Sequence, residues 1–145
     1  MIGIIVTGHG KFATGIETNV KLLVGKDAKI TTVDFDENDS VDALESKLTV
    51  ALEDIKDCEY KILLCDIIGG SPFNKAVMLT SERPDTRVIY GTHVAMVVEL
   101  CMKNLLEEKV EDIDDLVTEI ISIGKEQIGT FIKVDVIDHE CEDGI

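Results

Sequence analysis

The stretch Met1–Phe12, MIGIIVTGHGKF, decides the fold. Its first half is almost entirely apolar, which is typical of a strand that is buried on both faces of a parallel sheet. The run stops at Thr7–Gly10, where His9 stands between two glycines. Ligands of such sheets bind outside the carboxyl ends of the strands, so His9 is the first candidate for a functional residue.

Apolar runs alternate with amphipathic segments along the rest of the chain. The pattern predicts strands over residues 1–7, 30–35, 60–65 and 87–90. It predicts helices over residues 11–24, from a Ser40 cap to about 55, from 71 to before Pro84, and over 93–106 and 113–128. This regular alternation predicts an α/β fold, a doubly wound parallel sheet flanked by helices.

Residues 130–137 have a different pattern, because apolar and polar side chains alternate there one by one. This alternation is typical of a half-buried strand, often an antiparallel or an edge strand. We therefore expect the chain to end in a strand that differs from the buried parallel ones.

Length and composition restrict the class of protein. The chain has 145 residues, 45 % of them hydrophobic, which fits a single domain with a sizeable core. The formal net charge of −15 argues against binding to nucleic acid or to an anionic membrane, and favours a basic protein partner.

The chain shows no targeting signal in its first residues. The N-terminal apolar run is too short for a signal peptide, and no stretch is long enough to span a membrane. The four cysteines lack a CxxC spacing and are interpreted as free thiols of a reducing compartment. We expect a cytoplasmic protein.

The residues that follow the third strand complete a candidate site. Asp66 comes directly after that strand and would meet His9 if the first and third strands are neighbours. A carboxylate that accepts a hydrogen bond from one imidazole nitrogen fixes the tautomer, and the other nitrogen is then a free nucleophile. Ser71 is expected to cap the next helix, whose amino end suits an anion.

These residues together indicate a site that holds a phosphoryl group on a histidine. The residues expected to leave room for the group or to contact it are Gly8, Gly10, Gly69, Gly70 and Thr92. Taken one at a time, the same motifs are also typical of exposed turns and helix caps, and His93 is as well suited to packing. A metal site at residues 139–141 lacks a fourth ligand, so no metal is expected.

Three motifs carry a resemblance to a known family. IIVTGHGKFATG (residues 4–15), DIIGGSPFN (66–74) and VIYGTH (88–93) together resemble the mannose family of enzyme IIA components of the bacterial sugar phosphotransferase system. The resemblance implies that His9 is phosphorylated, that Asp66 orients it and that Ser71 is an active-site residue. It implies transfer from phospho-HPr to an enzyme IIB.

The resemblance also implies architecture and partners. It implies a parallel sheet in the order 2-1-3-4, with residues 130–137 as a fifth, antiparallel strand exchanged between the subunits of a homodimer. No metal or organic cofactor is implied, and the membrane is reached only through the sugar permease. Residues 1–145 are expected to be one IIA domain, with enzyme IIB on a separate chain.

Three alternatives remain open at this stage. One is the phosphotransfer subunit of dihydroxyacetone kinase, whose histidine loop usually carries serines in place of Gly8 and Gly10. Another is a regulatory module that uses phosphorylated His9 as a signal without passing the group on. The third is a metal or redox protein that uses its cysteines.

Overall fold

The computed structural model describes residues 1–135 and contains four strands and five helices within them. They follow one another as β1 (Ile2–His9), α1 (Phe12–Leu23), β2 (Thr31–Phe35), α2 (Val41–Asp54), β3 (Tyr60–Cys65), α3 (Ser71–Thr80), β4 (Thr86–Ile89), α4 (Val94–Leu105) and α5 (Ile113–Glu126). The predicted alternation is confirmed, with ends that shift by a few residues. Among residues 1–135, no helix has the length and apolar character that crossing a membrane requires.

The strands form one parallel sheet in the order β2-β1-β3-β4, as the resemblance implied. The central strand β1 pairs on both sides, so that Ile5 lies opposite Thr31 of β2 and Leu63 of β3. After β1 the chain continues to β2 on one side of the sheet, and after β3 it continues to β4 on the other side. The carboxyl ends of β1 and β3 therefore border the switch point at which ligands bind in such sheets.

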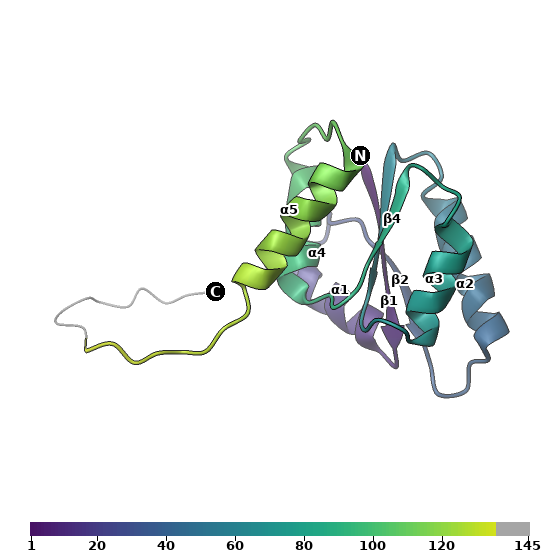
Figure 1. Ribbon diagram of the computed structural model, residues 1–145, viewed down its shortest axis with the longest axis horizontal. Helices are drawn as coiled ribbons and strands as arrows, with labels where there is room; N and C mark the ends of the chain where they lie inside the picture. The colour runs from purple at the N-terminus through teal and green to yellow at the C-terminus, as the bar shows by residue number, and fades with distance from the viewer. Residues whose placement is uncertain (136–145) are drawn as a thin grey trace.

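Helices cover both faces of the sheet (Figure 1). Helices α1, α4 and α5 pack on one face around a core that includes Ile4, and α2 and α3 pack on the other around Ile5. Successive side chains of a strand point to opposite faces, so Ile4 and Ile5 face different layers of helices. Both are buried because helices cover both faces. This explains why the opening stretch of the sequence has no polar alternation.

Two helices begin at side-chain caps. The Ser40 hydroxyl accepts a hydrogen bond from the Ala43 amide at 3.0 Å, which confirms the predicted start of α2. The Asp112 carboxylate accepts bonds from the Asp114 and Asp115 amides in the first turn of α5. Each cap satisfies amides that the helix itself leaves without an acceptor.

Residues 129–135 run away from the sheet (Figure 1). The strand predicted over 130–137 is absent from its described part, and the side chains of Phe131, Ile132 and Val134 are exposed. A strand needs a partner for its backbone groups, and this single chain offers none here. Val136 and Ile137 lie outside the described residues, and exchange of the segment in a homodimer stays a prediction.

Candidate functional site

His9 and Asp66 meet at the carboxyl ends of β1 and β3. The His9 Nδ1 atom lies 2.7 Å from Asp66 Oδ2, and the His9 amide donates to the same oxygen at 2.9 Å. The other carboxylate oxygen accepts a bond from the Ile67 amide at 2.8 Å. The carboxylate is therefore held from three sides, and it fixes one edge of the imidazole ring.

The environment of Asp66 decides which imidazole nitrogen carries the proton. Burial raises the pKa of Asp66, but the hydrogen bonds from His9 and from the Ile67 amide outweigh burial and bring its pKa below the ordinary value. The carboxylate is thus ionised at neutral pH and only accepts. We therefore assign the proton to Nδ1 of His9, which leaves a lone pair on Nε2.

The His9 ring is partly open to solvent. The His9 side chain is 45 % exposed, whereas that of Asp66 is 13 % exposed. Among residues 1–135, Nε2 of His9 has no hydrogen-bond partner. A neutral imidazole with a fixed tautomer and an open nitrogen can act as a nucleophile.

Two glycines allow the close approach of these groups. A Cβ atom on Gly8 would lie 2.5 Å from the Phe12 ring and 2.9 Å from Asp66 Cγ. A Cβ atom on Gly70 would lie 2.6 Å from His9 Cε1. Gly8 thus makes room for the carboxylate, and Gly70 makes room for the imidazole ring. Both were predicted to bind the phosphoryl group. In the structure, both glycines make room for the contact between His9 and Asp66.

The end of β2 also borders the site, and the sequence did not predict this. The Phe35 ring lies 5.8 Å from the His9 ring between centroids, and the Gly10 amide donates to the Phe35 carbonyl at 2.8 Å. Asp34 reaches the amino end of α1, where its carboxylate accepts from the Thr14 amide at 3.0 Å and from the Thr14 hydroxyl at 2.6 Å. The available signal was Asp34, an acidic residue inside the predicted strand and not in the acidic loop that follows it.

The amino end of α3 differs from the prediction in one detail. Gly70, with extended backbone angles, occupies the cap position, and Ser71 is the first helical residue. The prediction that Ser71 caps α3 is therefore wrong, because the chain turns one residue earlier. Among the described residues the Ser71 hydroxyl makes no hydrogen bond, so it is available to a ligand.

The first helical bond of α3 runs from the Asn74 amide to the Gly70 carbonyl. The amides of Ser71 and Phe73 precede it and have no acceptor inside the helix. The Asn74 side chain donates to the Gly69 carbonyl at 3.0 Å and holds the preceding loop against the helix. An amino end of this kind, beside the Gly70 that the imidazole packs on, can bind an anion.

Thr92 follows β4 and was predicted to contact the phosphoryl group, but it is buried. Its amide donates to the Cys65 carbonyl at 3.2 Å, and the amide of its neighbour Gly91 donates to the Asp66 carbonyl at 3.0 Å. The Thr92 hydroxyl is buried and has no partner among the described residues, so solvent does not reach it. The loop supports the backbone of Asp66, while His93 bonds to the Gly124 carbonyl at 2.8 Å.

Two of the three described cysteines, Cys65 and Cys101, are buried and do not resemble a reactive thiol site. Burial and then the charge of Asp66 raise the pKa of Cys65 to about 12. Burial raises the pKa of Cys101 to about 11. Both stay protonated at neutral pH and are poor nucleophiles. Cys141 and the residue 139–141 cluster lie outside the described residues.

A comparison with protein families decides the family of this chain. The model of the family described as the PTS system fructose IIA component, EIIA-man, matches residues 3–120. The chain belongs to the EIIA-man family. Its members are IIA components of the phosphotransferase system, which are phosphotransferases, and the mannose-family resemblance of the three motifs is thereby confirmed.

Individual relatives agree with this assignment. The EIIA-man chain is 27 % identical over 113 residues to the PTS system fructose-specific EIIA component of Bacillus subtilis (strain 168), covering 73 % of this chain and 77 % of the relative. It is 26 % identical over 127 residues to the PTS system mannose-specific EIIAB component of Escherichia coli (strain K12), covering 88 % of this chain. It spans 38 % of the length of that relative.

A solved structure shows the same architecture. The mannose/sorbose specific IIA subunit of the phosphotransferase system from Enterococcus faecalis superposes with a TM-score of 0.81 at 25 % sequence identity. The match covers 93 % of this EIIA-man chain and 98 % of the other. The doubly wound sheet described above is thus shared with a IIA protein of the same system.

Proposed function

We propose that the chain carries a phosphoryl group on Nε2 of His9, which it accepts from phospho-HPr and passes to an enzyme IIB during sugar uptake. The observation that supports this most directly is the 2.7 Å contact between His9 Nδ1 and Asp66. It directs the free nitrogen of the imidazole outward, where a partner protein can reach it. Membership of a family of phosphoryl carriers supports the same role.

The transfer is a displacement at phosphorus between two histidines. The lone pair of His9 Nε2 attacks the phosphorus of the donor phosphohistidine, a new N–P bond forms, and the donor N–P bond breaks with its electron pair returning to the donor ring. His9 Nδ1 keeps its proton and shares it with Asp66. The carboxylate stabilises the positive charge that the ring gains, and the same steps run toward enzyme IIB.

The phosphoryl oxygens are held in this proposal by the amino end of α3. The Ser71 amide and hydroxyl donate to them, and the positive end of the helix dipole opposes their charge. Four glycines leave space for the phosphoryl group, namely Gly8, Gly10, Gly69 and Gly70. Thr92 contributes through its backbone, whose amide bonds to the Cys65 carbonyl. Positioning and charge stabilisation then supply most of the rate enhancement.

The assembly and setting of the protein are part of the proposal. Residues 1–145 form a single IIA domain that works in the cytoplasm, as a homodimer in which residues 130–137 are exchanged. The protein reaches the membrane only through the permease. The reaction uses no metal or organic cofactor.

Mass spectrometry after incubation with phosphoenolpyruvate, enzyme I and HPr tests the proposal. We expect one acid-labile phosphoryl group on the wild type and none on His9→Ala, because among residues 1–135 no other histidine is paired with a carboxylate. The matched control is His93→Ala, because the His93 ring bonds to the Gly124 carbonyl of α5 and not to a carboxylate. This variant should be labelled like the wild type. Labelling of His9→Ala would contradict the assignment.

A chase with enzyme IIB separates carrier from regulator. We expect the phosphoryl group to leave His9 within the chase, because the group is held at an open edge. Retention on His9 would favour the regulatory alternative. Transfer to a dihydroxyacetone kinase partner in place of enzyme IIB would favour the kinase alternative, which the sugar-system relatives do not support.

A further inference from the structure

Lys11 occupies a position where the fold gives no reason for a lysine. It is the cap residue of α1, between Gly10 and Phe12, and its side chain makes no capping hydrogen bond. Helix caps favour short polar side chains, and the positive end of the helix dipole lies at this end, so a cation here is unfavourable for stability. A residue that conflicts with local rules beside a candidate site is itself a candidate for function.

The cap that Lys11 lacks is supplied from β2. The Asp34 carboxylate accepts hydrogen bonds from the amide and the hydroxyl of Thr14 in the first turn of α1, at 3.0 Å and 2.6 Å. The Gly15 amide donates to the Lys11 carbonyl at 2.8 Å and holds the backbone of the turn. These contacts fix the loop through its backbone and through Asp34, and they give the side chain of Lys11 no structural role.

The Lys11 ammonium has no partner in the described part of the chain. Its side chain is exposed, and no carboxylate among residues 1–135 forms an ion pair with it, although the chain has 29 acidic residues. Lys47 of α2 and Lys75 of α3, in contrast, are both paired with carboxylates. The positive charge of Lys11 is therefore available to a ligand.

Lys11 is also the only lysine or arginine in the loops that border the site. These loops follow the four strands and comprise residues 8–12, 34–38, 66–74 and 90–93. Several of their side chains are acidic, namely Asp34, Asp36, Glu37 and Asp66. A phosphoryl group brings about two further negative charges at neutral pH. Within these loops, Lys11 is the one side chain whose fixed positive charge opposes them.

We infer that the Lys11 ammonium binds the phosphoryl group carried by His9 and stabilises its charge against the surrounding carboxylates. The inference rests on the proposed function. Lys11 follows His9 by two residues, and the flexible stem of a lysine brings its ammonium to a nearby oxyanion without a change of the backbone. Lys11 acts on the phosphorylated form, since the free imidazole carries no charge for it to oppose.

The equilibrium of the transfer separates this role from a role in docking. The equilibrium constant for transfer from phospho-HPr to this chain compares the free proteins before and after the reaction. A contact that exists only in the complex changes the rate and leaves the constant unchanged, because an interaction shifts an equilibrium only when it differs between the two end states. Native mass spectrometry of both proteins at equilibrium measures the constant.

Lys11→Met should lower this constant about three- to tenfold, since an ion pair near water is only moderately stabilising. Lys11→Gln is a second neutral variant and should show the same loss, whereas Lys11→Arg keeps the charge and should retain most of the constant. Lys26→Met is the matched control. It removes the same charge from an exposed lysine just beyond the other end of α1 and should leave the constant unchanged.

The outcomes distinguish the inference from the proposed function. An unchanged constant in both neutral variants would overturn the inference while leaving the proposed function in place, and a change in rate alone would assign Lys11 to docking. An equal loss in Lys26→Met would also overturn it, because net charge and not position would then be the cause. A wild type that phospho-HPr does not label on His9 would overturn the proposed function and the role of Lys11 with it.

Discussion

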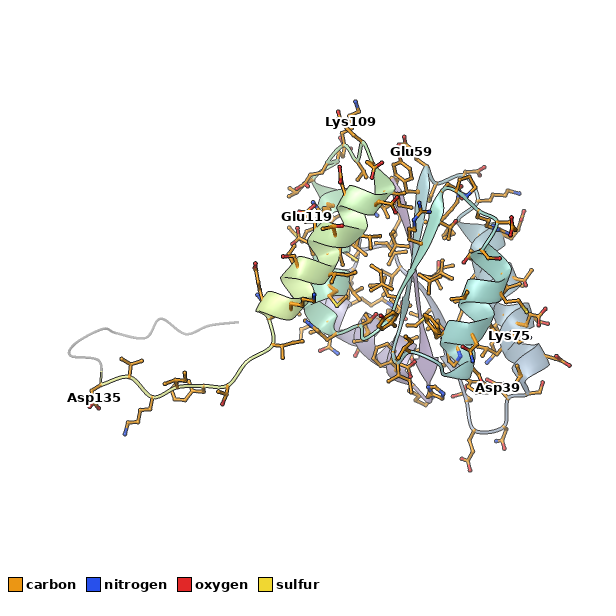
Figure 2. The ribbon with its side chains drawn as sticks, in the orientation of Figure 1. Asp39, Glu59, Lys75, Lys109, Glu119 and Asp135 are labelled. Atoms are coloured by element: carbon orange, nitrogen blue, oxygen red, sulfur yellow. The ribbon has the colours of Figure 1, made fainter. Side chains whose placement is uncertain are left out.

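At the amino ends of the strands charged side chains are buried in ion pairs, whereas at the carboxyl ends reactive and apolar side chains are left open. The Lys61 ammonium lies 2.6 Å from Asp85, and Lys103 lies 3.0 Å from Glu108 and 2.9 Å from Glu119. Figure 2 shows Glu59 and Lys109 at this end of the molecule and Asp39 at the opposite end. Polar groups at the amino end thus already have partners within the chain.

The carboxyl end leaves comparable groups without partners. Among the described residues, His9 Nε2 and the Ser71 hydroxyl make no hydrogen bond, and Ile67 and Ile68 are exposed. Exposed donors and acceptors bind water in an isolated chain, and they and the exposed apolar surface are available to a ligand or a partner. The contrast places the buried lysine ion pairs at one end of the sheet and the proposed phosphoryl site at the other.

Gly70→Ala should damage the carboxyl end most while leaving the amino end intact. The added methyl group would lie 2.6 Å from His9 Cε1, so the ring must turn away from Asp66. We expect transfer from phospho-HPr to fall about 100-fold, as for other misplaced reacting groups. Quench-flow labelling measures the rate, and ¹⁵N shifts of the imidazole report the ring tautomer. Gly15→Ala, where no heavy atom lies within 4 Å, is the control and should transfer normally.

Asp66→Asn should remove the charge that supports the imidazole. We expect transfer to slow at least tenfold and stability at pH 7 to fall by about 1–2 kcal/mol, because charge-assisted hydrogen bonds are lost. The pKa of Asp66 is lowered in the folded state, so its contribution is complete above the unfolded pKa of about 3.9 and disappears as the pH falls through the lower folded value.

Urea unfolding of wild type and Asp66→Asn at a series of pH values measures this contribution. The two midpoints should differ at pH 7 and converge as the pH drops below about 3.9. A difference that persists unchanged in strong acid would show that the carboxylate charge is not its source. The Asp85 carboxylate, which also has a lowered pKa from its bond to Lys61, remains in both proteins and affects both equally.

Lys103→Met should weaken the amino end alone. Burial lowers the pKa of Lys103, but the bonds to Glu119 and Glu108 outweigh burial and raise it. Losing these bonds should cost about 1–2 kcal/mol of the free energy of unfolding, since both carboxylates are partly solvated and methionine fills the same space. Transfer at His9 should be unchanged. Lys109→Met, on an exposed lysine, is the control and should have a wild-type midpoint in urea.

Thr14→Val should have the smallest effect and probe the link between α1 and β2. It removes the hydroxyl bond to Asp34 and should lower the free energy of unfolding by about 1 kcal/mol, with a small decrease in transfer. Thr14→Ser keeps the hydroxyl and should restore both values. Failure of serine to restore them would indicate that packing, and not the bond to Asp34, is responsible.

Local patterns were sufficient for the four parallel strands and the five helices, but not for residues 130–135, and they singled out His9 and Asp66. The apolar runs around Ile5 and Leu63 predicted buried parallel strands, and the breaks after them directed attention to His9 and Asp66. These predictions are possible because a strand that is buried on both faces is a continuous apolar run, and the end of the strand is a break in that run. The strand order came from the resemblance, and the sheet confirms it.

Contacts between distant segments were beyond the sequence. The bond from Asp34 to Thr14, the packing of Phe35 on His9 and the depth of Thr92 depend on the register between strands and on how α1 and α4 sit on the sheet. The cap of α3 lies at Gly70 and not at Ser71 because the chain turns one residue earlier, and the His9 ring occupies the space that a side chain on Gly70 would need.

By itself, the sequence determined where the strands and helices lie and that a histidine and an aspartate end two of the strands. Only the tertiary structure decided that their side chains meet, because a contact of 2.7 Å depends on strand pairing and on the glycines that let the groups approach. Periodicity is a property of neighbouring residues, whereas such a contact joins segments 57 residues apart.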